Sequence, residues 1–127
     1  AQYAAVAALR GSQSFIPGMV ASFDRRIASA MGVIESTPGL SLVAKPEGAF
    51  YLFIRFADLA AKCPSVHTSS SGNFVNYLLE QSGVAAVPGE AFGDDSAFRI
   101  SVASADENIA EGVRRIKDAV AALIAKA

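Results

Sequence analysis

Arg99 is the residue of this chain best suited to binding chemistry. It lies in Phe98–Ala103, which reads Phe-Arg-Ile-Ser-Val-Ala. Side chains alternate along an extended strand, so the apolar residues Phe98, Ile100 and Val102 share one face. Arg99 is then fixed on the opposite face, where its planar fork can donate two parallel hydrogen bonds to a carboxylate. The same pattern is compatible with an arginine that only keeps a strand soluble.

Other side chains with catalytic potential are few and isolated. The single histidine, His67, lies in a polar stretch, and the single cysteine, Cys63, has no histidine at a fixed spacing. Ser69–Ser71 lacks the strand-to-helix elbow that activates a nucleophilic serine. The adjacent acids Asp94 and Asp95 could cap backbone, coordinate an ion or remain solvated. We therefore predict no catalytic, metal-binding or cofactor-binding residue in this chain.

The segment before the Arg99 strand is rich in glycine and proline. It covers residues 87–93 and reads Val-Pro-Gly-Glu-Ala-Phe-Gly. Glycine permits tight backbone and close approach of other groups. This loop is either a structural turn or part of a binding site next to Arg99.

Two long amphipathic helices are predicted toward the ends of the chain. In both, apolar residues recur every three or four positions, which is typical of a helix with one buried face. The first stripe is Val20, Phe23, Ile27, Met31 and Ile34, and the second is Ile109, Val113, Ile116, Val120, Leu123 and Ile124. Ser104 and Glu107 have the spacing of a capping box at the start of the second helix.

Short strands are predicted between these helices, at 40–44, 49–56, 84–87 and 97–103. The turn Pro46–Gly48 joins the first two strands into an antiparallel hairpin. A shorter helix is expected at 74–82, with Phe74, Leu78 and Leu79 facing inward. Residues 57–62 are expected to form one helical turn, and residues 63–72 a surface loop.

The element order α-β-β-α-β-β-α predicts an α+β fold, a two-layer sandwich in which helices cover one face of a small, mostly antiparallel sheet. The long terminal helices are expected to pack together across that sheet. Its other face would then expose Arg99, Tyr51 and Phe53.

Composition restricts the classes of protein to consider. The chain has 127 residues, of which 52% are hydrophobic and 18% charged, as in one globular domain. A net charge of −1 without a basic block argues against nucleic-acid or membrane partners. A single cysteine fits a reducing compartment, so we expect a cytoplasmic protein. The chain opens inside a predicted helix without an initiator methionine, so we expect a fragment.

Several stretches together resemble the class I/II aminotransferases, the aspartate aminotransferase group of fold-type I pyridoxal-phosphate enzymes. Residues 46–51 are similar to the P-x-G-A-F-Y signature of the family's small domain, and residues 83–93 to its Gly-Val-x-x-Val-Pro-Gly-x-x-Phe-Gly signature. Residues 98–103 match a third signature, and residues 107–116 resemble the family's last helix. Residues 2–9 resemble the helix just before the small domain.

The resemblance implies the small domain of the PLP-dependent transferase fold. Residues 1–11 would end a large-domain or interdomain helix, and residues 12–127 would form the C-terminal small domain. Arg99 lies where the family holds the arginine that binds the substrate's α-carboxylate. The family's Schiff-base lysine lies in the large domain, and the lysines of this chain do not stand in the matching context; they are Lys45, Lys62, Lys117 and Lys126.

In function, the resemblance implies amino-group transfer between an amino acid and a 2-oxo acid. The cofactor would be pyridoxal 5'-phosphate, bound in the full-length homodimeric enzyme and absent from this fragment. The partner of the fragment would be the missing large domain, and alone it should be inactive. The alternative is a standalone amino-acid-binding or interaction module without catalysis.

Overall fold

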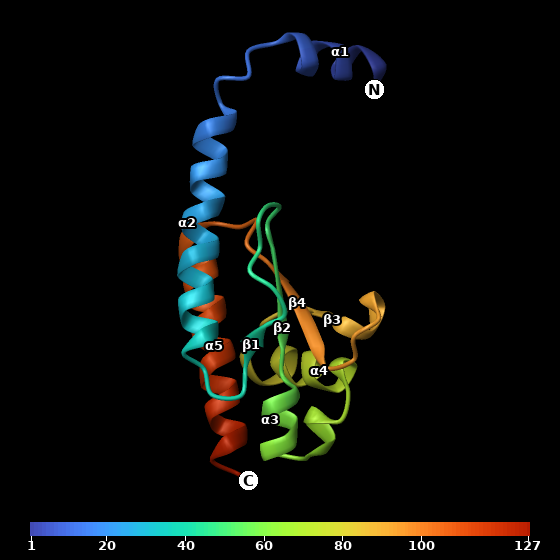
Figure 1. Ribbon diagram of the computed structural model, residues 1–127, viewed down its shortest axis with the longest axis vertical. Coiled ribbons are helices and arrows are strands. Elements are labelled where there is room, and N and C mark those ends of the chain that lie inside the picture. The colour runs from blue at the N-terminus through green and yellow to red at the C-terminus, as the bar shows by residue number, and fades with distance from the viewer.

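The computed structural model describes residues 1–127, with five α-helices and a four-stranded sheet (Figure 1). The helices are α1 (Gln2–Arg10), α2 (Ile16–Glu35), α3 (Ala57–Lys62), α4 (Ser71–Ser82) and α5 (Asp106–Ile124). The strands are β1 (Ser41–Leu42), β2 (Tyr51–Arg55), β3 (Val87–Pro88) and β4 (Ala97–Ser101). Two short 3-10 helices, η1 (Val66–Thr68) and η2 (Gly89–Phe92), lie in the connections.

The sheet is antiparallel throughout, in the order β1-β2-β4-β3. The predicted hairpin forms, with Leu42 opposite Ile54. The longest ladder joins the central strands β2 and β4, from the pair Tyr51–Ser101 to the pair Arg55–Ala97. The predicted α+β sandwich with a small antiparallel sheet is confirmed.

One face of this sheet forms the floor of the core. Burial alternates along the central strands: Leu52 and Ile54 of β2 and Phe98 and Ile100 of β4 are buried, and the residues between them are more exposed. Apolar residues of α2, α4 and α5 join these strands in one cluster. The helices therefore cover one face and leave the other bare, as predicted.

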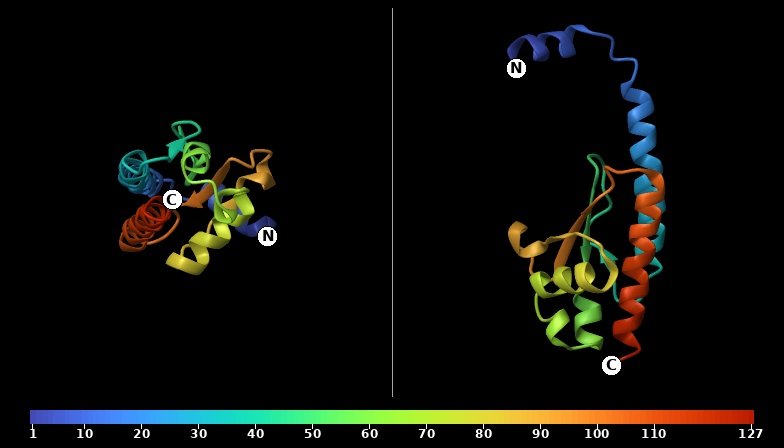
Figure 2. Two further views of the ribbon diagram at one scale, coloured as in Figure 1. Left: turned by 90° about the horizontal axis from the view of Figure 1, so that it is seen from below. Right: turned by 180° about the vertical axis from the view of Figure 1, so that it is seen from behind.

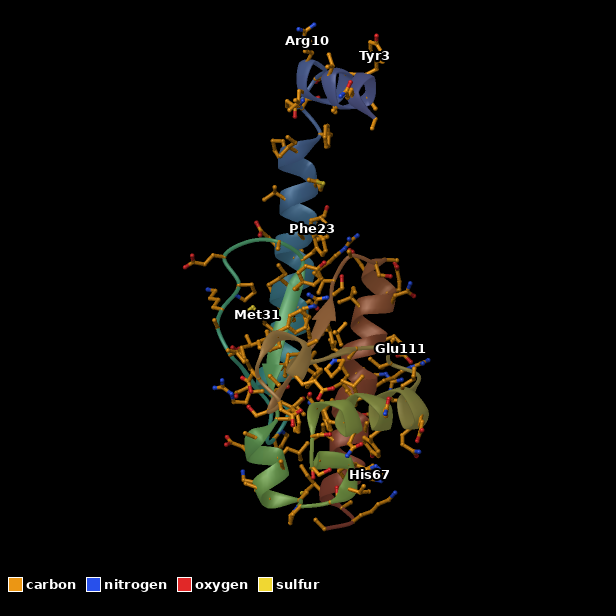
Figure 3. All side chains as sticks on the ribbon, turned by 90° about the vertical axis from the view of Figure 1, so that its right-hand side faces the viewer. Tyr3, Arg10, Phe23, Met31, His67 and Glu111 are labelled. Atoms are coloured by element: carbon orange, nitrogen blue, oxygen red, sulfur yellow. The ribbon has the colours of Figure 1, made fainter.

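The two long helices α2 and α5 lie side by side (Figures 1 and 2). Arg26 of α2 donates to the Asp106 carboxylate in the first turn of α5. The N-terminal turns of α2 extend beyond the sheet, where Val20 is 48% exposed, so its predicted place in the core stripe is wrong. Beyond them, α1 contributes no buried residue, and its Tyr3 and Arg10 lie far from the core (Figure 3).

The third strand begins later than predicted, although helix α4 ends at Ser82 before Gly83 as expected. Gly83 adopts a left-handed conformation, φ 67°, and the N–H groups of Gly83 and Val84 bond to carbonyls of the last turn. Val84 therefore belongs to the helix end, and pairing with β4 begins only at Val87.

Residues 63–72 are more ordered than the predicted surface loop. Cys63 and Thr68 are buried, and the Thr68 hydroxyl donates to the Cys63 carbonyl at 2.8 Å. In α4, Leu79 is exposed instead of inward. Tyr77 is buried there instead, and its hydroxyl donates to the Ala119 carbonyl of α5 at 3.0 Å.

The predicted capping box of α5 does not form. Helix α5 begins at Asp106, after Ala105, so Ser104 lies one residue too early to cap it. Its hydroxyl instead accepts a hydrogen bond from the Asn108 side chain. No helix combines the length and apolar character that crossing a membrane requires.

The aromatic centre of the core gives a test of this packing. Phe74 is fully buried, stacked on Phe56 at 4.6 Å between ring centroids and edge-on to Phe98 at 5.3 Å. We expect Phe74→Ala to lower the free energy of unfolding by about 3–5 kcal/mol, because it leaves a cavity. The exposed Phe15 is the control: Phe15→Ala should change it by less than about 0.5 kcal/mol in urea titrations. Equal changes in the free energy of unfolding for the two variants would contradict the burial of Phe74 in the core.

Candidate functional site

Arg99 lies in the middle of the uncovered sheet face. Its direct cross-strand neighbours are Phe53 of β2 and Val87 of β3. Tyr51 lies on the same face, two residues before Phe53. The structure thus places Arg99, Tyr51 and Phe53 together on this face, as the alternation predicted, with Val87 added from the edge strand.

The Arg99 guanidinium contacts two aromatic rings. Its Cζ is 4.3 Å from the centroid of the Tyr51 ring and 4.4 Å from that of the Phe92 ring. Phe53 meets the Phe92 ring edge-on, with centroids 5.9 Å apart. Contacts of this kind are attractive, because an aromatic face is electron-rich and a guanidinium is flat and weakly hydrated.

No carboxylate of this chain pairs with Arg99. The ion pairs of the structure use Arg25, Arg26, Arg55, Arg114 and Arg115. Beside Arg99 is a hollow of about 160 Å³, lined by Tyr51, Ser101 and residues 85–87 among others. The guanidinium is therefore available to an anion from outside the chain.

Three larger hollows lie elsewhere, and none of them has an unpaired charge on a strand of the sheet. One, of about 360 Å³, lies between residues 83–85 and α5, and its charged residues Glu111 and Arg115 bind each other at 2.7 Å. Two arginines hold the pKa of Glu111 at about 2, so this carboxylate is satisfied within α5. A second, of about 370 Å³, lies between the end of α4 and α5 and is lined by Lys126 among others. The third, of about 780 Å³, is a largely apolar groove between α2 and residues 45–50. An unpaired charge on a rigid sheet distinguishes the Arg99 hollow from all three.

The predicted Gly/Pro loop is folded as β3 and η2, and it carries Phe92 to Arg99. Gly89 is essential to its path, because a Cβ there would lie 2.2 Å from the Asp94 carbonyl oxygen and 2.3 Å from that of Ala97. Gly93 ends η2 in a left-handed conformation, φ 86°, which favours glycine. The loop is thus both a structural turn and a wall of the site.

Ser71 ties this loop to helix α4. Its hydroxyl donates to the Asp95 carboxylate at 2.7 Å and accepts from the Glu90 backbone N–H at 3.1 Å. The Ser71 backbone N–H adds a bond to the same carboxylate at 2.8 Å. The bonds from Ser71 lower the pKa of Asp95 below its usual range.

Asp94 fixes the other side of the loop. It accepts from the Ser96 backbone N–H at 2.9 Å and from Arg55 at 3.2 Å, and its pKa is lowered mainly by the bonds from Ser96. Of the roles open to these adjacent acids, local capping is the one the structure shows. They hold the loop that carries Phe92.

The remaining candidate side chains lie outside this site. The His67 ring packs against Tyr77, with centroids 4.9 Å apart, at the lower end of the molecule in Figure 3. Cys63 is buried in the core. Sequence reasoning had placed Tyr51 on the right face but had not assigned Phe92 to the site. The available signal was an aromatic residue between the glycines of a loop that leads directly to Arg99.

Comparison with known proteins gives the class of this fold and site. The family described as aminotransferase class I and II matches residues 1–116. A probable aspartate/prephenate aminotransferase of Aquifex aeolicus is 40% identical over 122 residues, which are 94% of this chain and 29% of that protein. A second one, from Rickettsia prowazekii, is 40% identical over 96% of this chain and 31% of its own length.

Solved structures of aminotransferases also superpose on this chain. The aspartate aminotransferase of Rhizobium meliloti superposes with a TM-score of 0.85 at 38% identity, over 94% of this chain and 30% of that one. An aromatic aminotransferase of Pyrococcus horikoshii gives a TM-score of 0.80 at 33% identity, over 95% and 31%. A PLP-bound putative aminotransferase of Clostridium difficile gives 0.72 at 25% identity, over 85% and 26%.

The chain therefore belongs to the class I and II aminotransferases. It spans about three tenths of the length of the curated relatives it matches.

The Ser71–Asp95 contact predicts a pH dependence of stability. The folded-state pKa of Asp95 is lowered, so its stabilising contribution is present above the unfolded carboxyl pKa, about 3.9, and is lost as pH falls through the folded value. Asp95→Asn should lower the urea midpoint most above about pH 5, and the difference from wild type should narrow below about pH 4.

The control for this experiment is Asp24→Asn, which removes an α2 carboxylate that takes part in no ion pair. It should shift the midpoint little at any pH. A pH-independent difference between Asp95→Asn and wild type would show that the charge of Asp95 does not stabilise the loop.

Proposed function

We propose that Arg99 binds the α-carboxylate of the substrate in an enzyme that transfers an amino group between an amino acid and a 2-oxo acid. The observation that carries the proposal is the guanidinium itself, which has no carboxylate partner in the chain and faces a hollow on the uncovered sheet face. Amino acids and 2-oxo acids share the carboxylate next to the reacting carbon. A fixed bidentate contact would orient either one for reaction.

The side chain of the substrate would be selected elsewhere. The relatives named above are aspartate/prephenate aminotransferases, so aspartate and prephenate are the first pair to assay. A second carboxylate needs a second cation, and the other arginine that forms no ion pair, Arg10, lies on the distant helix α1. We propose that the residue that selects the side chain lies outside these 127 residues.

Pyridoxal 5'-phosphate is the proposed cofactor, held by residues outside this chain. No lysine lines the hollow beside Arg99. Lys117 reaches Ser36 across the outer side of α2 and α5 at 3.5 Å, and Lys45 borders the groove beside α2. The residues present thus do not form a site for the cofactor by themselves. When bound in the whole protein, it would supply the electron sink, and this chain would bind and orient the carboxylate.

We propose that residues 12–127 form the small domain, and that residues 1–11 connect it to a large domain in a cytoplasmic homodimer. Support comes from apolar residues without a partner. Tyr3 is 94% and Leu9 83% exposed on α1, and Met19 and Val20 are about half exposed on the extended part of α2. Apolar surface of this kind usually marks an interface.

Replacing Arg99 in the full-length enzyme tests its role. Arg99→Lys keeps the charge but loses the planar fork, so we expect kcat/KM for the amino acid to fall about 10- to 150-fold, the value of one charge-assisted hydrogen bond. Absorbance of the bound cofactor should stay normal. Unchanged kinetics would mean that Arg99 does not bind the carboxylate. Arg10→Lys, far from the sheet, is the matched control and should leave kcat/KM unchanged.

The 127-residue chain itself distinguishes an enzyme part from an independent binding module. With pyridoxal phosphate, aspartate and prephenate added, we expect no transamination, since the chain has no lysine near Arg99. Calorimetry with amino acids should detect no binding, because one arginine provides too little affinity. Turnover would refute the proposal that the cofactor is held by residues outside this chain. Measurable affinity for amino acids would favour a standalone amino-acid-binding module.

A further inference from the structure

We propose that Phe92 is a positioning residue that, together with Tyr51, fixes the plane of the Arg99 guanidinium and so restricts its ligands to groups that bind in that plane. This inference deepens the proposed function and rests on it. It assigns a role to the loop that the structure folds over Arg99.

Two aromatic rings contact the same guanidinium. The Tyr51 and Phe92 ring centroids lie 4.3 and 4.4 Å from the same Cζ atom. Two rings at this distance occupy space next to the guanidinium that water or an anion could otherwise fill. The nitrogen–hydrogen bonds all lie in the plane of the group, so hydrogen bonding at its edge remains available.

The two rings come from different parts of the fold. Tyr51 begins the central strand β2, which pairs with β4 along its length. Phe92 ends η2, held in place by the close approach of Gly89 to the Asp94 and Ala97 carbonyls and by the bond from the Glu90 N–H to Ser71. Both rings therefore contact Arg99 only while the loop and the sheet are in their folded positions.

Phe92 has no large share in the core that would explain its place. Its side chain is 48% exposed, and its ring contacts are with Arg99 and with Phe53 on the same bare face. A half-exposed phenylalanine between a glycine-dependent turn and a left-handed glycine contributes little to folding. Its contact with an arginine that has no acidic partner points to orientation of the guanidinium.

A planar carboxylate fits this arrangement because its two oxygens can meet two parallel donors at the edge of the guanidinium. A lysine at position 99 could not reproduce it, since an ammonium has no plane to stack or to align. The aromatic walls thus add selectivity for a flat bidentate anion to the positive charge of Arg99.

The first test uses NMR of the 127-residue chain and requires no cofactor. Stacked rings shield nuclei above and below them, so the Arg99 side-chain protons should resonate upfield of those of the exposed Arg10. Phe92→Leu should move them back toward the Arg10 position. Phe15→Leu, which removes an exposed ring at the far end of α2, should leave them in place. Arg99 protons at the Arg10 position in the wild-type chain would overturn the proposal.

The second test uses steady-state kinetics of the full-length enzyme. Phe92→Leu should raise KM for the amino acid about 3- to 30-fold, the value of one cation–π contact, with kcat nearly unchanged because the carboxylate is bound alike in ground and transition states. Phe92→Tyr, which keeps a ring, should restore KM. A KM unchanged by Phe92→Leu, or a loss not rescued by Phe92→Tyr, would overturn the positioning role.

The outcomes separate this inference from the function on which it rests. If Arg99→Lys lowers kcat/KM as expected but Phe92→Leu behaves as wild type, Arg99 binds the carboxylate without help from Phe92. If neither substitution changes the kinetics, Arg99 does not bind the carboxylate, and the role of Phe92 that rests on it is wrong as well.

Discussion

The pairing of β2 with β4 is the constraint on which the rest of this structure depends. In an extended strand, each residue is turned to the face opposite its neighbour. Because Phe98 and Ile100 are buried beneath the helices, Arg99 must lie on the uncovered face of the sheet. Burial of Leu52 and Ile54 places Phe53 on the same uncovered face. A slip of one residue in this register would bury the arginine and expose the aromatic core. Hydrophobic burial on one face therefore fixes the position of a charge on the other.

The two faces of the sheet serve different purposes. The covered face gathers the large apolar side chains of four helices and provides the stability of the chain. The bare face carries the polar and half-exposed residues around Arg99, where the η2 loop contributes Phe92 but no α-helix covers the strands. Rigid support from below and open access from above is the combination that a binding site on a sheet needs, because the ligand meets side chains whose backbone is already fixed.

The environment of Arg99 differs from that of the paired arginines. Arg26, Arg114 and Arg115 have carboxylate partners within the chain, and those contacts join α2 to α5 or stabilise α5 locally. Arg99 has aromatic faces in place of an acidic partner, which are attractive to a guanidinium but do not neutralise its charge. The charge remains available at the edge of the guanidinium, where an incoming carboxylate would supply the acidic partner that this chain does not provide.

The sequence by itself determined the elements, the α+β class, the face on which Arg99 lies and the resemblance to a family. These follow from local rules: the period of apolar residues distinguishes helix from strand, and alternation assigns the faces. Only the tertiary structure decided that Val84 completes a helix end, that Tyr77 and not Leu79 enters the core, and that Ser71 and Asp95 hold the η2 loop. It also brought Phe92 to Arg99, seven residues further on but facing it across a turn that no periodicity describes. Such contacts depend on the path of the backbone in three dimensions, where one glycine with no room for a Cβ decides the position of a ring.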